Sequence, residues 1–138
     1  RDKFPFEIEG KTLLEMMINK GMEMTFAAYT LPDTPDDLLM GYTPAQLQWC
    51  QDNERMIWSY FKKQNLLFST QLQQVMRYTL EGPSSTGMPP EAPGNIGTWI
   101  GWQIVKKYLK ENPDIKWHEL VKKKIDAQTF LQTSKYKP

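Results

Sequence analysis

The sequence predicts an all-α fold, a compact bundle of about five to six helices with one long loop rich in proline and glycine. Three observations lead to this prediction. Apolar residues recur at helical spacing in six stretches, capping residues or prolines bound these stretches, and no alternation is long enough for a sheet. The chain has 138 residues, of which 40% are hydrophobic and 12% aromatic, so we expect a single domain over residues 1–138.

The first helix is expected from Thr12 to about Thr30, after a short lead-in over residues 1–10. Thr12 is a suitable N-cap, and Glu15 lies three residues further on, as in a capping box. Apolar residues surround all but a narrow polar strip of this helix, which indicates that it is mostly buried. Gly21 lies in the middle of the apolar face, so we expect another helix to pack closely against it.

An acidic, proline-containing connector over residues 31–43 leads to a second helix, expected over residues 44–64. Thr43 and Gln46 supply its capping pair. Glu54 lies near the centre of the apolar arc of this helix, where a carboxylate must be paired or neutral. We therefore expect Glu54 to have low exposure and a hydrogen-bonding partner. A structural carboxylate is favoured, and a site residue in a cleft is the alternative.

A third helix is expected over residues 71–80, before a loop over residues 81–94 that contains four prolines and three glycines. Loops of this length are often functional. After the stop signal at Asn112-Pro113, two short helices are expected, over about residues 115–124 and 126–133.

The helix between the loop and Asn112 is the one around which the chain is arranged. Gly97 and Gly101 lie one turn apart on its apolar face, where each costs about 1 kcal/mol relative to alanine, so we expect close backbone packing there. Trp99 lies on the opposite face among lysines. We expect it to pack under the loop over residues 81–94 or under the lead-in near Phe4-Pro5-Phe6. An exposed patch that docks a partner is the less favoured alternative.

Several stretches resemble the GldB-type gliding-motility lipoproteins of Bacteroidetes and their non-gliding relatives. The run from Glu91 to Val105 is similar to the family's C-terminal signature, and residues 134–138 match its terminal motif. Shorter matches upstream extend the resemblance to about residues 13–138. The family usually carries arginine where Asn95 stands. The resemblance implies a cell-envelope lipoprotein, at the periplasmic face or the outer membrane, whose secretion signal and lipid-bearing cysteine lie upstream of this sequence.

The resemblance also reaches HExxH-type zinc peptidases, whose metal motif would lie upstream. In relatives that keep the peptidase pattern, a glutamate before a glycine would supply the third zinc ligand. Here that position is Lys20, before Gly21, and a protonated ammonium has no lone pair for zinc. The resemblance therefore implies an impaired or repurposed peptidase.

The chain itself offers little chemistry. His118 and Cys50 are its single histidine and cysteine, and no zinc or nucleophile constellation is visible. We expect His118 to be an ordinary surface or half-buried residue and Cys50 to be a small buried hydrophobe. We expect no catalytic residue, metal or cofactor. The net charge of +1 argues against nucleic-acid binding, although residues 102–138 alone carry nine basic and four acidic side chains.

Two classes of function remain open. The first is a noncatalytic helical module that recognises a partner in motility, secretion or envelope machinery, either the upstream domain of the same protein or another envelope protein. The second is the substrate-cleft half of a zinc peptidase whose metal motif lies upstream. Membrane attachment is expected only through an upstream N-terminal lipid anchor. The candidate cleft or partner-facing residues are Lys20, Glu54, Glu91, Asn95 and Trp99.

Overall fold

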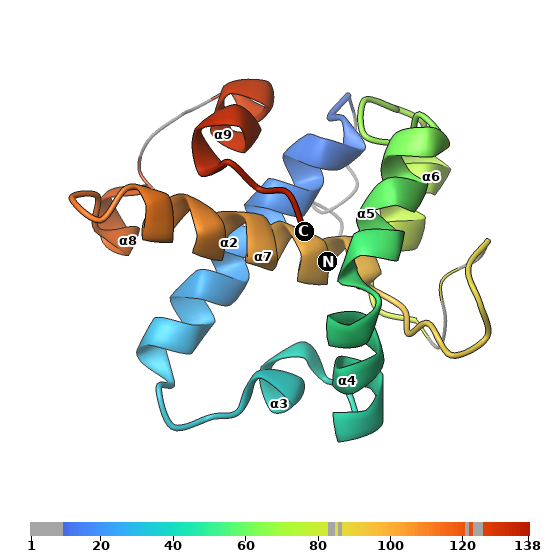
Figure 1. Ribbon diagram of the computed structural model, residues 1–138, viewed down its shortest axis with the longest axis horizontal. Helices are drawn as coiled ribbons and strands as arrows, with labels where there is room; N and C mark the ends of the chain where they lie inside the picture. The colour runs from blue at the N-terminus through green and yellow to red at the C-terminus, as the bar shows by residue number, and fades with distance from the viewer. Residues whose placement is uncertain (1–9, 83–84, 86, 121, 123–125) are drawn as a thin grey trace.

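The computed structural model describes residues 10–82, 85, 87–120, 122 and 126–138, and all regular structure within them is helical (Figure 1). The all-α prediction is therefore confirmed for this part of the chain. Figure 1 labels the eight helices that it contains: α2 (Leu13–Thr30), α3 (Asp36–Met40), α4 (Pro44–Asp52), α5 (Glu54–Lys63), α6 (Leu72–Thr79), α7 (Ile96–Glu111), α8 (Trp117–Leu120) and α9 (Ala127–Ser134).

The described residues contain more helices than the five to six expected, for two reasons. α3 forms inside the acidic connector, where Pro35 precedes it and Gly41 ends it in a left-handed conformation. The helix expected over residues 44–64 is divided at Asn53. The side-chain Nδ2 of Asn53 donates to the Trp49 carbonyl at 2.8 Å, and such local bonds compete with the helical backbone pattern.

The predicted helix starts are confirmed where a local capping motif determines them. The Thr12 N–H donates to Glu15 Oε1 at 2.7 Å, and the Glu15 N–H donates to Thr12 Oγ1 at 3.1 Å, which completes a capping box. α4 begins with the same reciprocal pair, made by Thr43 and Gln46. α8 is shorter than the helix expected over residues 115–124, since it spans only four residues. Residues 121, 123 and 124 of the expected range lie outside the described part.

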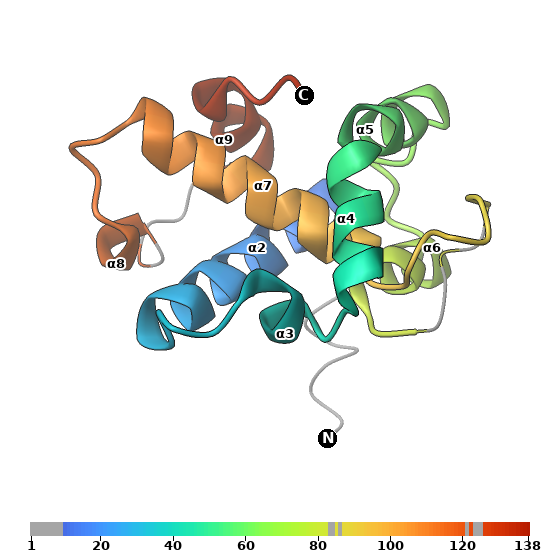
Figure 2. The same cartoon turned by 60° about the horizontal axis from the view of Figure 1, so that its bottom comes forward.

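α2 and α7 cross at the centre of the molecule with their backbones in contact (Figure 2). A Cβ atom added to Gly101 would overlap the Met17 carbonyl oxygen, and one added to Gly21 would overlap the Gly101 carbonyl oxygen. At Gly97 an added Cβ would lie 2.6 Å from the Tyr78 carbonyl oxygen of α6. The close packing predicted at these three glycines is therefore present.

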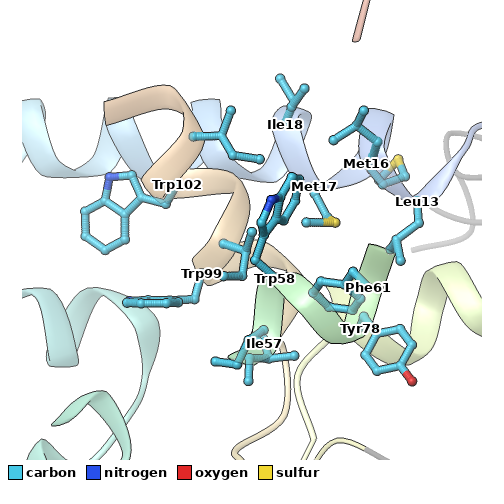
Figure 3. Packing of buried hydrophobic residues seen from close by; sticks show 14 of the residues in the cluster. Leu13, Met16, Met17, Ile18, Ile57, Trp58, Phe61, Tyr78, Trp99 and Trp102 are labelled. Atoms are coloured by element: carbon cyan, nitrogen blue, oxygen red, sulfur yellow. The ribbon is translucent and has the colours of Figure 1, made fainter. Parts of the chain in front are cut away.

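The core is one hydrophobic cluster to which each of the eight described helices contributes (Figure 3). Trp99 is part of it, with 2% of its surface exposed. Figure 3 shows its indole directed toward the teal ribbon that contains α3 and α4. The exposed-patch alternative for Trp99 is therefore wrong, and packing is confirmed. The lead-in near Phe4-Pro5-Phe6, one of its two expected covers, lies outside the described residues. Every residue from Ile96 to Trp102 is buried, so the first half of α7 has no solvent-exposed face.

Candidate partner-binding cleft

Two adjoining depressions meet at the start of α7. One has a volume of about 410 Å³ and lies between α3, α4 and the two ends of the loop over residues 81–94. The other, of about 220 Å³, lies between α2, α3 and the junction of α6 with the loop. Both are lined by Met40, Glu81 and Asn95, and we call the combined depression the Asn95 cleft.

Asn95 occupies an unusual position at the head of α7. Its φ of 58° is in the left-handed region, which asparagine adopts more readily than most residues. Asn95 is the N-cap residue of α7, yet its side chain makes no capping hydrogen bond. Its Oδ1 atom is buried and accepts no hydrogen bond from any described group. A buried acceptor without a donor is rare and requires an explanation.

The backbone around Asn95 is held by side chains from other elements. The Tyr42 hydroxyl donates to the Gly94 carbonyl at 2.8 Å, and the Ser85 hydroxyl donates to the Pro93 carbonyl at 2.7 Å. Burial, followed by the effect of Cys50, raises the pKa of Tyr42, so its hydroxyl remains a donor at neutral pH. A Cβ atom on Gly94 would overlap the Gly82 carbonyl, so the two loop ends are in backbone contact. The cleft is therefore preformed on this side.

Lys20 is the second predicted site residue that the structure places in the cleft. Its side chain is 17% exposed, and its Nζ lies 3.8 Å from Glu23 Oε1 one turn further along α2. Glu81 lines both depressions as well, and we did not predict it. No local pattern marks Glu81, because only the tertiary fold brings it to Asn95.

The other candidate residues do not line the cleft. Glu91 is exposed on the loop, and Trp99 is buried in the core. Glu54 is the first residue of α5 and lines a separate shallow groove of about 290 Å³ together with Tyr136 and lysines of α7. The five candidates therefore do not form one site.

The predicted hydrogen-bonding partner of Glu54 is present. The Tyr136 hydroxyl donates to Glu54 Oε2 at 2.7 Å, and burial together with this carboxylate raises the pKa of Tyr136. The predicted low exposure of Glu54 is met only in part, since the side chain is half-buried. The physical reason is the break at Asn53, which places Glu54 at a helix start and not in the middle of a long apolar arc.

We predict that Glu54→Ala lowers the free energy of unfolding by about 1 to 3 kcal/mol, because the buried Tyr136 hydroxyl loses its acceptor. Glu54→Gln retains an acceptor, so it should lower the free energy of unfolding by clearly less than Glu54→Ala does. Urea denaturation of both variants measures the difference. Tyr136→Phe provides the control: combined with Glu54→Ala it should cost less than the sum of the single changes. Equal losses for alanine and glutamine, with additive double variants, would contradict this role of the hydrogen bond.

Cys50 and His118 are the remaining side chains that could carry reactive chemistry. Cys50 is fully buried, and burial raises the pKa of its thiol to about 12, so the thiolate is scarce at neutral pH. His118 is exposed on α8. Within the described residues, no three His, Cys, Asp or Glu side chains are grouped closely enough to hold a metal ion. None of the described helices has both the length and the hydropathy that crossing a bilayer requires.

The fold and the cleft define an all-α protein whose described side chains form a polar surface depression at a helix crossing. A family model described as gliding motility protein GldB matches residues 1–138, so the chain belongs to the GldB family of gliding-motility lipoproteins. This confirms the resemblance to the GldB-type lipoproteins and implies a location in the cell envelope, whereas the resemblance to zinc peptidases stays a prediction. Neither the curated proteins nor the solved structures contain a significant match to the chain.

Proposed function

We propose that the chain is a noncatalytic module of an envelope lipoprotein, at the periplasmic face or the outer membrane, and that it binds a partner polypeptide in the Asn95 cleft. The observation that supports this proposal is the buried Oδ1 atom of Asn95, which accepts no hydrogen bond from the described residues. Leaving such an acceptor unpaired costs about 1 to 3 kcal/mol. Because Oδ1 has almost no accessible surface, the Asn95 side chain has to rotate toward the cleft before a partner N–H group can donate to it, and that bond recovers this free energy on binding.

The lining of the cleft suits a polypeptide main chain. Asn95 supplies an amide side chain, and Thr98 in the first turn of α7 lines the cleft as well. Lys20 and Glu81 line the cleft with charges of opposite sign, which can select the side chains of a partner. The partner is another envelope protein or the upstream part of the same polypeptide. Lys20 lies where the peptidase alternative would require a carboxylate ligand, which favours the binding module.

Photo-crosslinking in cells that make the native lipoprotein tests this proposal. A photoreactive amino acid at position 81 should give a discrete adduct, and the same group at the exposed position 128 of α9 should not. Mass spectrometry then distinguishes a second protein from a crosslink within one polypeptide. Asn95→Gly removes the acceptor while allowing the positive φ, so it should abolish the adduct without lowering the melting temperature. If position 81 gives no adduct, or if the adduct persists in Asn95→Gly, the proposal is wrong.

A further inference from the structure

A ridge of exposed apolar side chains lies where the end of α2 meets α8. Phe26, Tyr29 and Leu31 are exposed over 53%, 56% and 53% of their surfaces. The Trp117 ring of α8 stacks on the Tyr29 ring, with 5.1 Å between the ring centroids. It meets the Phe26 ring edge-on, with 5.7 Å between the centroids. Figure 1 shows α8 and the end of α2 at one side of the molecule, away from α5 and α6. We call the exposed Phe26, Tyr29 and Leu31 together with the half-buried Trp117 the aromatic ridge. Such clustered exposure marks an interaction surface.

A basic groove adjoins the ridge. It has a volume of about 390 Å³, lies between α2 and α7, and is lined by Tyr29 on one side and by Lys106 and Lys110 on the other. Its described lining includes no acidic residue. Lys106 Nζ lies 3.2 Å from Asp36 Oδ2, with both side chains 44% exposed. An ion pair this exposed contributes little, so a competing anion can replace Asp36.

The charges around the ridge itself are balanced. Asp33 is exposed in the turn after α2, and Glu119 is exposed on α8, where its Oε1 accepts the Lys116 N–H at 3.0 Å. Lys116 directly precedes α8 and Lys122 follows it in the sequence, and both are exposed. The groove beside Tyr29 adds the positive charge of Lys110 and that of Lys106, whose partner is Asp36.

We infer that the aromatic ridge and the basic groove together form a contact face for a bilayer that contains anionic phospholipid. Phenylalanine, tyrosine and tryptophan side chains partition into the headgroup region, where their apolar bodies leave water. Lys106 and Lys110 then attract the anionic headgroups. A protein partner on this face would have to bury both lysines and pair them specifically, whereas lipid headgroups leave them hydrated. A lipoprotein of the cell envelope has such a bilayer nearby.

Sedimentation with vesicles tests this inference on the purified chain without lipid modification. The chain should bind vesicles of equal parts phosphatidylglycerol and phosphatidylcholine and bind pure phosphatidylcholine vesicles more weakly. Lys106→Gln and Lys110→Gln should each weaken binding to the anionic vesicles about fivefold and leave binding to the neutral vesicles unchanged. The double variant Phe26→Ser/Tyr29→Ser should weaken binding to both at least about tenfold.

Phe68→Ser is the matched control, because Phe68 is 55% exposed and lines a different groove, next to α5. It should bind both kinds of vesicle like the parent chain, and far-UV circular dichroism should show every variant folded. The inference is overturned if the parent does not bind anionic vesicles, as would be expected for a face that takes a protein partner. It is equally overturned if Phe68→Ser weakens binding as much as the ridge variant.

Discussion

Gly101→Ala should lower the free energy of unfolding by about 3 kcal/mol or more. The added methyl group would overlap the Met17 carbonyl oxygen, and a backbone atom of a buried helix cannot move aside as a flexible side chain can. α2 and α7 would have to separate at the point where they cross. Helix propensity alone predicts the opposite sign, since alanine is favoured over glycine by about 1 kcal/mol in a helix interior. The sign of the change therefore reports on the close packing.

Urea denaturation followed by far-UV circular dichroism measures the effect. Gly82→Ala is the matched control, because a Cβ atom added there meets no atom within 4 Å. Its free energy of unfolding should change by no more than about 0.5 kcal/mol. A Gly101→Ala variant that is as stable as the parent chain, or more stable, would show that the helix backbones do not touch at this point.

The parts of the fold that the sequence predicts correctly are those with local causes. A capping box needs only two side chains three residues apart, so the starts of α2 and α4 could be identified from Thr12 and Thr43. The division at Asn53 is also local, but asparagine occurs within helices as well as at their ends. Its effect depends on which carbonyl its side chain reaches, and the apolar period alone does not reveal this.

The sequence identifies only two of the residues that line the Asn95 cleft, for a different reason. Asn95 and Lys20 were identified as candidates separately, and nothing in the sequence indicates that they line one depression. Their proximity results from the crossing of α2 and α7, which depends on Gly21 and Gly101. The sequence predicts close packing at these glycines but not the partner of each. Glu81 could not be found without that pairing.

The helical wheel failed for Trp99 because it assumes that a helix has one wet face along its whole length. α7 is amphipathic only in its second half, where the exposed residues Lys106 and Lys110 lie. Its first half runs through the core and is buried on every side. The lysines that marked the polar face come from the second half of the helix, so they describe the surroundings of Lys106 and not those of Trp99.

Trp99→Ala should therefore behave as a stability variant. Truncating a tryptophan that is 2% exposed removes a large buried contact area and leaves a cavity, at a cost of about 3 to 5 kcal/mol. For a chain of this size the thermal midpoint should fall by about 10 °C or more. Differential scanning calorimetry of the variant beside the parent chain measures the shift. Phe68→Ala provides the control, because Phe68 is 55% exposed and its truncation should change the midpoint little. If Trp99→Ala has the same thermal midpoint as the parent chain, the indole does not pack in the core. The alternative of an exposed docking residue would then hold.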